Sequence, residues 1–293
     1  MLIGVDIGNC ATKTSEGIIF NSVTSEADGL LNGIDITIDG INYCVGVGVN
    51  RIDTNKVDTE LALVCMYTAL AMSSTDNNFT VVTGLPIAQY KTQAKDFENY
   101  IMKNNRRRVC YNNVERTITI DSIKVYAQGA GALYSQYVGS NAIVVDIGSL
   151  TSDIALFEIH NGKRSLSKYS TLYCGMFQLY SRVISAVNNK FKLSLPSDYA
   201  ETIFNSGLTV DGEPQDLSFL KPIIANHLQE IFNELDLNYP VRTIPVFLCG
   251  GGAYVLSNAF TKKYKNSIVL KNSQFSNAVG FKKVGENLCL VRK

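Results

Sequence analysis

One tetrapeptide, Val-Asp-Ile-Gly, occurs twice in the chain, and each copy opens a similar polar stretch. Residues 5–14 read VDIGNCATKT and residues 145–154 read VDIGSLTSDI. In each copy an apolar strand, Leu2–Ile7 or Ala142–Asp146, runs into a glycine turn and then into a second short strand, which is the pattern of a β-hairpin. A self-similar segment that returns about 140 residues later indicates an internal duplication of one domain plan.

The chain has 293 residues, which is long for one core and sufficient for two domains. Strand and helix patterns alternate along both halves, which predicts an α/β fold in each. We predict domain I at 1–140, with a subdomain inserted at about 30–120, and domain II at 141–293, with one inserted at about 160–240. Further strands are predicted at Gly17–Asn21, Ile34–Ile38, Tyr43–Val47, Phe79–Gly84, Val109–Tyr111, Val114–Ile120, Asp153–Glu158 and Ile244–Cys249, and helices at Thr59–Met72, Ala94–Asn104, Gln128–Tyr137, Phe177–Lys190, Ser197–Asn205, Leu217–Leu235 and Ala253–Tyr264.

The two glycine turns favour an anion ligand. Gly8 and Gly148 lack a Cβ, so backbone N–H groups at these turns can approach an anion closely. Asp6 and Asp146 end the two equivalent strands. A pair of carboxylates suits Mg²⁺, which takes few protein ligands and keeps most of its waters. Hydroxyl, amide and ammonium groups nearby suit phosphate oxygens; they are supplied by Asn9, Thr12, Lys13, Ser149, Thr151 and Ser152, with Asp153 beside them.

A third motif lies in the second half, where the apolar strand Ile244–Cys249 runs into Gly250-Gly251-Gly252 and directly into a helix. Glycines there let a flat ligand lie against backbone, and the helix N-terminus carries a positive dipole end. The motif lacks the Gly-Lys-Ser/Thr of a P-loop and the spacing of a dinucleotide fingerprint. Alone it is a weak indication of a ligand site, and it becomes informative because it follows the two hairpins in the chain.

These motifs, in this order, resemble the nucleotide-binding motifs of the superfamily of actin, sugar kinases and heat-shock chaperones. Asp6–Lys13 resembles the phosphate-1 loop, Asp146–Asp153 the phosphate-2 loop and Leu248–Ala253 the adenosine motif. Gln128–Tyr137 is similar to the first connecting helix and Asn277–Gly280 resembles the final connecting segment. The resemblance implies a two-domain actin-like α/β fold, a duplicated ribonuclease H-like design with inserted smaller subdomains and a central nucleotide cleft.

Within that superfamily the chain is most similar to the bacterial and plasmid actin-like proteins of the ParM group. Thr83–Pro86, the basic stretch behind it and Lys124–Gln128 carry this likeness. It implies a cytoplasmic, filament-forming ATPase that drives plasmid DNA segregation, with ATP (or GTP) and Mg²⁺ as cofactors. The implied partners are further copies of the chain and a DNA-binding adaptor, with no direct membrane contact, and the segment from about 275 to 293 is expected to pack back on domain I.

The resemblance also implies roles for single residues. Asp6 and Asp146 hold the metal through water, and Gln128 positions the attacking water, so these three form the predicted catalytic set. Glu201 lies where relatives bind the ribose hydroxyls. The predicted nucleotide contacts are Gly8, Asn9, Cys10, Thr12, Lys13, Gly148, Ser149, Leu150, Thr151, Gly175, Glu201, Gly250, Gly251 and Gly252.

Two other functions stay open. A small-molecule kinase of the same superfamily needs an aspartate base near the first connecting helix, and Ala127–Ala132 contains none. A non-catalytic nucleotide-binding scaffold would recruit a partner instead of assembling with itself. Two departures from the family pattern, Asn9 in place of Ser or Thr and Ser149 in place of a second Gly, bear on turnover rate and nucleotide preference.

Composition excludes several other classes. The net charge is +1, from 27 basic and 26 acidic residues, so no overall field favours nucleic acid or an anionic membrane. Seven cysteines without CxxC spacing indicate reduced thiols in the cytoplasm, not a structural zinc site. No apolar stretch reaches the ~18–20 residues of a membrane span. We predict the basic Arg106–Arg108 to be a solvated loop, with contact to DNA or a neighbouring subunit as the alternative.

Overall fold

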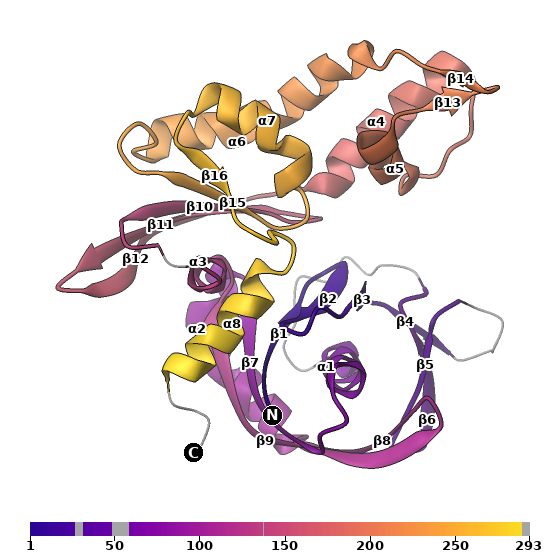
Figure 1. The fold of residues 1–293 in the computed structure, drawn as a ribbon, viewed down its shortest axis with the longest axis vertical. Coiled ribbons are helices and arrows are strands. Elements are labelled where there is room, and N and C mark those ends of the chain that lie inside the picture. The colour runs from indigo at the N-terminus through magenta and orange to yellow at the C-terminus, as the bar shows by residue number, and fades with distance from the viewer. Residues whose placement is uncertain (27–31, 49–58, 137, 289–293) are drawn as a thin grey trace. The chain divides into compact units, whose positions relative to one another are not determined.

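The computed structural model describes residues 1–26, 32–48, 59–136 and 138–288 of the chain. They form two compact units, Met1–Gly139 with Leu270–Lys293, and Ser140–Val269 (Figure 1). Each unit is a mixed α/β structure built on its own sheet, as the duplicated sequence pattern predicts. Among the described residues, no helix combines the length and apolar character needed to cross a bilayer.

The first unit is built on a nine-stranded sheet in the order β3-β2-β1-β7-β9-β8-β5-β6-β4. Strand β1 is antiparallel to β2 and parallel to β7, and β7 is parallel to β9. The strands are β1 (Leu2–Ile7), β2 (Ala11–Thr14), β3 (Ile19–Asn21), β4 (Thr24–Glu26), β5 (Ile34–Ile38), β6 (Ile41–Val45), β7 (Asn78–Leu85), β8 (Arg106–Tyr111) and β9 (Val114–Ala127), and the helices are α1 (Glu60–Ser73), α2 (Ile87–Lys103), α3 (Ala130–Tyr134) and α8 (Ser276–Asn287).

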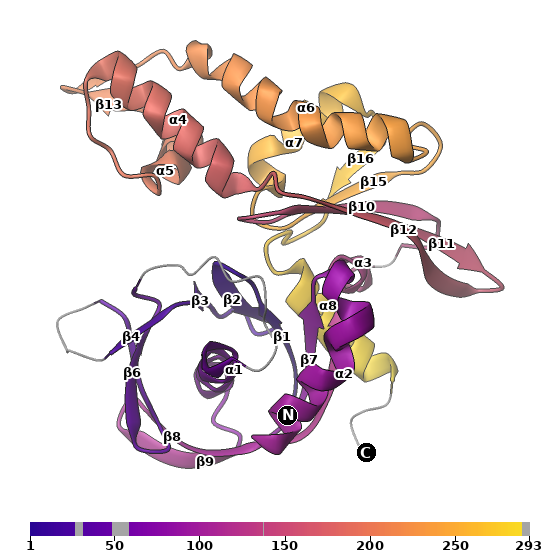
Figure 2. The same ribbon diagram turned by 180° about the vertical axis from the view of Figure 1, so that it is seen from behind.

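Helix α1 is enclosed by this sheet, which curls around it (Figures 1 and 2). Apolar residues surround the helix axis, and nine of its fourteen residues are buried; a helix that is apolar on all sides needs such an environment. Thr59 Oγ1 accepts from the N–H of Ala62 at 3.2 Å and so caps the N-terminus. At the other end the Arg116 guanidinium donates to the carbonyls of Ala71 and Ser74, which compensates the unpaired C-terminal acceptors.

Helix α8 rejoins the first unit and packs on β1 and α3 with almost no space between the backbones. A Cβ built on Gly4 would lie 1.9 Å from the carbonyl oxygen of Ala278, and one built on Gly280 would lie 1.7 Å from that of Gly131. The ring of Phe281 is fully buried, and it fills the space that a side chain at Gly131 would need. Glycine at these positions is therefore required for α8 to dock.

Three sequence predictions in the first unit need correction. The stretch Arg106–Arg108 is not a loop: it begins strand β8, where Arg107 forms a 2.7 Å ion pair with Asp39. Helix α2 begins directly after Pro86, about two turns before the predicted start, because proline fits the first positions of a helix. Helix α3 is shorter than Gln128–Tyr137, because Gly129 has a φ of +75° and separates Gln128 from the helix; Tyr137 lies outside the described residues.

The second unit has a five-stranded sheet in the order β12-β11-β10-β15-β16, with β15 parallel to both β10 and β16. A small hairpin, β13–β14, stands apart from it. The strands are β10 (Ala142–Ile147), β11 (Ser152–His160), β12 (Lys163–Leu172), β13 (Thr209–Val210), β14 (Glu213–Pro214), β15 (Val246–Cys249) and β16 (Ser267–Val269), and the helices are α4 (Met176–Phe191), α5 (Tyr199–Ser206), α6 (Lys221–Asn238), α7 (Ala253–Lys263) and the short 3₁₀ helix η1 (Ser218–Leu220).

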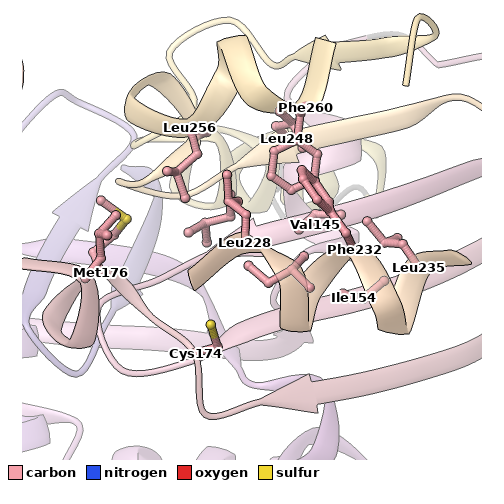
Figure 3. Close-up of a cluster of buried hydrophobic side chains, with 14 of the residues drawn as sticks. Val145, Ile154, Cys174, Met176, Leu228, Phe232, Leu235, Leu248, Leu256 and Phe260 are labelled. Atoms are coloured by element: carbon pink, nitrogen blue, oxygen red, sulfur yellow. The ribbon is translucent and has the colours of Figure 1, made fainter. Parts of the chain in front are cut away.

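The core of this unit lies between the sheet and its helices (Figure 3). Val145 and Leu248 of the sheet face Leu235 of α6 and Leu256 of α7 in one buried cluster. The rings of Phe232 and Phe260 meet edge to face at 5.0 Å, a favourable arrangement for aromatic pairs. Strand β12 was not predicted from the sequence, because six of its ten residues are Lys, Arg or Ser, the composition of an exposed sheet edge.

A buried histidine should make the stability of this unit depend on pH. His227 is 1% exposed, with the Cys174 sulfur 3.6 Å from its ring nitrogens. Burial, reinforced by the Arg182 charge, lowers the pKa of His227 to about 4, against about 6.5 in the unfolded chain. Between these values the unfolded state binds more protons, so the free energy of unfolding falls as pH drops through this window, by about 2 kcal/mol from pH 7.5 to pH 5.

Urea unfolding of the unaltered chain and of His227→Gln at both pH values measures this contribution. The difference between the two pH values should shrink by about 2 kcal/mol in the variant. His160→Gln is the matched control, because the His160 side chain is 69% exposed. An unchanged pH dependence in His227→Gln would contradict the assignment.

Candidate functional site

The two Val-Asp-Ile-Gly hairpins have the same geometry residue by residue. In the first, Asp6 pairs with Lys13 across β1–β2 and the Gly8 N–H donates to the Ala11 carbonyl at 3.0 Å. In the second, Asp146 pairs with Asp153 across β10–β11 and the Gly148 N–H donates to the Thr151 carbonyl at 2.9 Å. The duplication read from the sequence is therefore present as two equivalent turns, one in each unit, which we call the first and second turns.

Asp6 and Gln128 form the polar centre of the first turn. Asp6 is 5% exposed, and its Oδ1 accepts from Gln128 Nε2 at 2.7 Å. Because a carboxylate only accepts hydrogen bonds, the amide must direct its NH₂ group to Asp6. The Gln128 Oε1 is then the end of the side chain that can accept from a water molecule. Gln128 is held in place by its own N–H, which donates to the Leu85 carbonyl at 2.9 Å.

The other predicted residues of the first turn differ in burial: four are half-buried and one is fully buried. Gly8, Asn9, Cys10 and Lys13 are half-buried, and a Cβ on Gly8 would lie 2.6 Å from the Ala11 carbonyl oxygen. Thr12, by contrast, is fully buried, and its hydroxyl lies 2.8 Å from Ser22 Oγ. The predicted phosphate contact of the Thr12 hydroxyl is thus replaced by a bond that supports the turn from inside, because alternate strand residues face opposite sides.

Asp146 and Gly250 depend on each other in the second turn. Gly250 has a φ of +83°, and a Cβ there would lie 2.4 Å from Asp146 Oδ1. A side chain at 250 would both strain the backbone and displace the carboxylate. Across the hairpin, Asp153 accepts from Thr171 Oγ1 at 2.5 Å and from Thr151 Oγ1 at 3.3 Å. These bonds fix the direction of the Thr151 hydroxyl.

Helix α4 begins against the second turn. The N–H groups of Met176 and Phe177 donate to the carbonyls of Gly148 and Ser149 at 3.0 and 2.9 Å. A Cβ on Gly175 would lie 2.4 Å from the Ser149 oxygen, so only glycine allows this approach. The Gly148 N–H is used within the turn, by the Thr151 carbonyl, and the turn carbonyls are occupied by α4. The half-buried N–H groups of Ser149 and Leu150 are the turn donors that suit an anion.

The three consecutive glycines have three different environments. Gly252 is buried, its N–H donates to the Ile147 carbonyl at 3.0 Å, and a Cβ there would lie 2.6 Å from the Met176 sulfur. Gly251 is exposed with nothing within 4 Å of a built Cβ, so it presents open backbone.

Glu201 is exposed on the first turn of α5, and its charge adds to burial in raising the pKa of Tyr180 to about 12.

Asp6 and Asp146 each provide a carboxylate of the kind that suits a magnesium ion held through water. Within the described residues, no group of three or more His, Cys, Asp or Glu side chains is arranged to bind a metal directly. Mg²⁺ does not require one, because it is commonly held by one or two carboxylates together with waters and substrate phosphates. Asp6 and Asp146 supply one such carboxylate at the same position of each turn.

Two supporting residues were not identified from the sequence. Thr171 of β12 orients Asp153, and Gln178 of α4 accepts from the Gly175 N–H at 3.0 Å. The Thr171 bond joins two strands, whereas the Gln178 bond is local to the start of α4. Only the Gly-x-x-Gln spacing before α4, a helix-start signal, could have indicated one of them.

Two family models match the chain, one in each half. Residues 4–131 match the family described as actin like proteins N terminal domain, and residues 144–262 match the archaeal actin homologue MreB-like family, C-terminal. The first match includes Asp6 and Gln128, and the second includes Asp146 and the three glycines. No curated protein sequence matches the chain.

Solved structures share the fold at low sequence identity. The archaeal actin homologue Ta0583 matches with a TM-score of 0.84 and 19% identity, over 98% of this chain and 99% of that one, and its complex with ADP also matches. A non-polymerisable quadruple mutant of pCBH ParM matches with a TM-score of 0.77 and 22% identity, and the ParM of a 15-stranded filament from Clostridium botulinum with 0.78 and 21%, both over 98% of this chain and 99% of the other.

Proposed function

This chain belongs to the actin-like superfamily, and from that premise we propose that it binds a nucleoside triphosphate with Mg²⁺ and hydrolyses it to control its own assembly into filaments. The observation that carries the proposal is the bond between Gln128 and Asp6 beside one of two equivalent glycine turns. That bond leaves an amide oxygen able to orient water next to a group suited to a metal.

The residues divide the work of phosphoryl transfer among them. Half-buried N–H groups at the two turns, with the Lys13 ammonium, bind phosphate oxygens, and the open backbone at Gly251 faces the nucleoside. Asp6 and Asp146 would hold Mg²⁺ through water, and the ion supplies positive charge to the phosphates when bound. Gln128 Oε1 accepts from a water and orients it for attack. Placing water in line and balancing charge provides most of the rate enhancement in such reactions.

Self-assembly into filaments is supported by relatives of the same fold. A 15-stranded ParM filament and an Alp12 filament are among the similar structures. We also propose a cellular role, plasmid DNA segregation through a DNA-binding adaptor in the cytoplasm. This role follows only from the likeness to ParM. ATP is the proposed nucleotide, with GTP as the alternative.

The two rival functions make different demands on the site. A kinase needs a general base for a hydroxyl substrate, and the residue beside Asp6 is an amide, which cannot take a proton in that role. A scaffold would bind nucleotide without turnover and without assembly. Simultaneous measurement of turnover and assembly separates the three.

The test is right-angle light scattering and phosphate release recorded together, with ATP-Mg²⁺, GTP-Mg²⁺ or no nucleotide. Scattering that rises only with nucleotide, above a threshold protein concentration, supports a nucleotide-driven filament. Bound nucleotide with flat scattering in every condition would overturn the filament proposal and leave the kinase or the scaffold.

Replacing Gln128 by Met should separate hydrolysis from assembly. The side chain keeps its length but loses the amide oxygen, so phosphate release should fall about 100-fold. Nucleotide affinity should stay within a few-fold, and filaments should form and then persist longer than those of the unaltered chain. Gln229→Met on the exposed face of α6 is the matched control. Normal phosphate release from Gln128→Met would show that Gln128 does not orient the water.

A further inference from the structure

Asn277, near the start of helix α8, is bonded to the start of helix α3, which lies beside α8 in both views (Figures 1 and 2). Asn277 is 6% exposed, and its Oδ1 accepts from the Gly129 N–H at 2.9 Å and from the Ala132 N–H at 3.1 Å. Both partners are donors, so the amide must direct its oxygen toward them. This one oxygen therefore serves two backbone groups of α3.

Helix α3 needs this oxygen because its own N-cap residue has no side chain. A helix is commonly capped by a side-chain oxygen of the N-cap residue, which accepts from an N–H two or three positions later. The N-cap residue of α3 is Gly129, whose φ of +75° favours glycine. Asn277 supplies the missing oxygen from 148 positions away in the sequence. The start of α3 is therefore fixed by α8.

The bond to Gly129 also fixes the backbone on the C-terminal side of Gln128. The Gly129 N–H belongs to the same planar peptide unit as the Gln128 carbonyl. The peptide unit on the other side is held by the Gln128 N–H, which donates to the Leu85 carbonyl at 2.9 Å. With both peptide planes held, the direction in which the Gln128 side chain leaves the backbone is set. That direction brings its amide to Asp6 Oδ1 at 2.7 Å.

A second residue of α8 lies close to the stem of the Gln128 side chain. A Cβ built on Gly84 would lie 2.2 Å from Cζ of Phe281 and 3.2 Å from Cγ of Gln128. The Phe281 ring and the Gln128 stem thus lie against the same glycine of β7, and the ring is fully buried. Helix α8 therefore contacts the surroundings of Gln128 at two points, by a polar bond from Asn277 and by packing of Phe281.

We propose that Asn277 is a positioning residue for nucleotide hydrolysis: by capping α3 from α8, it holds Gln128 in the orientation that presents its amide oxygen to water. The inference rests on the proposed function and adds a residue to it. Asn277 acts through Gln128, so it contributes to turnover and not to nucleotide affinity. A displacement of about 1 Å in a group that orients a reactant can cost up to about 100-fold in rate.

Removing the capping oxygen tests the proposal. Asn277→Leu keeps the approximate size of the side chain but cannot accept a hydrogen bond. Single-turnover phosphate release from ATP-Mg²⁺, compared at equal light scattering, should fall at least about 20-fold, while affinity for a fluorescent ATP analogue stays within about three-fold. Asn277→Asp should release phosphate within about three-fold of the unaltered chain, because a carboxyl group keeps an acceptor oxygen whether or not it is protonated.

A double variant separates positioning from a general effect on the fold. In the Gln128→Met background, Asn277→Leu should slow phosphate release by less than about two-fold, because the group that it positions is already absent. A purely structural role would instead slow release by the same factor in both backgrounds. If Asn277→Leu does not fold, Asn277→Ala makes the same comparison, with an expected fall of at least about five-fold in the unaltered background.

Ser276→Ala is the matched control at the adjacent position of α8. It removes the 2.8 Å bond from Ser276 Oγ to the Ser273 carbonyl and should leave phosphate release within about two-fold of the unaltered chain. The proposal fails if release from Asn277→Leu is normal, if Asn277→Asp is equally slow, or if the loss is as large in the Gln128→Met background. Any of these results overturns this inference alone when the unaltered chain hydrolyses nucleotide. An unaltered chain that releases no phosphate overturns the proposed function with it.

Discussion

An Asp146→Asn variant is expected to release phosphate from the nucleoside triphosphate at least about 100-fold more slowly than the unaltered chain. Asparagine keeps the shape of the side chain beside Gly250 but removes the charge that would hold Mg²⁺. Nucleotide binding by the variant should also lose most of its dependence on magnesium. Its affinity for nucleotide in Mg²⁺ should then approach its affinity in EDTA. Single-turnover phosphate release and titration with a fluorescent nucleotide measure the two effects.

Asp96→Asn is the control for this variant, because it makes the same chemical change on the exposed face of α2. Asp6→Asn should resemble Asp146→Asn, since both aspartates hold the same position of equivalent hairpins. Full turnover by Asp146→Asn, with its magnesium dependence intact, would remove Asp146 from the metal site. Loss of turnover in Asp96→Asn as well would point to a general effect on the fold.

The second large effect is expected from Gly280→Ala. Within a helix this change ordinarily stabilises by about 1 kcal/mol. Here the added Cβ would lie 1.7 Å from the backbone oxygen of Gly131, which cannot move aside as a flexible side chain can. Helix α8 must therefore separate from α3, and the free energy of unfolding should fall by about 3 kcal/mol. Urea unfolding followed by circular dichroism measures it.

Gly251→Ala is the matched control for stability, because a Cβ built at Gly251 has nothing within 4 Å. Its free energy of unfolding should stay within about 0.5 kcal/mol of the unaltered chain. The sign of the Gly280 effect is the decisive observation. A stabilised Gly280→Ala variant would show that α8 does not dock on α3 as closely as the structure has it.

Much of the fold could be predicted from the sequence, because local and tertiary preferences agree there. Strand β1 and strand β5 have their predicted bounds, and α1 begins one residue after the predicted start because Thr59 is its cap. The repeated tetrapeptide predicted two equivalent hairpins, and the register confirms that Asp6 and Asp146 hold equivalent positions. A short-range pattern of this kind predicts the structure well because the geometry of the turn depends on these local residues.

The remainder depends on contacts between distant segments. Arg106–Arg108 has the composition of a loop, yet Asp39 on the β5–β6 turn pairs with Arg107 and the neighbouring strands hold it as β8. The side of the hairpin that Thr12 faces depends on the pleat, which places its hydroxyl against Ser22 inside the unit. The amide orientation of Gln128 likewise depends on Asp6, which is 122 positions away. No local pattern encodes these partners.

The docking of α8 also sets an order of events during synthesis. Residues 276–287 belong to the first unit, but the whole second unit is encoded before them. A ribosome adding about 5–20 residues per second reaches them on the order of 10 s after Gly139. Until then Leu2 and Val82 lack the buried Phe281 that packs against them. The nascent chain can complete its second unit before α8 is made, but the first unit becomes whole only when α8 arrives.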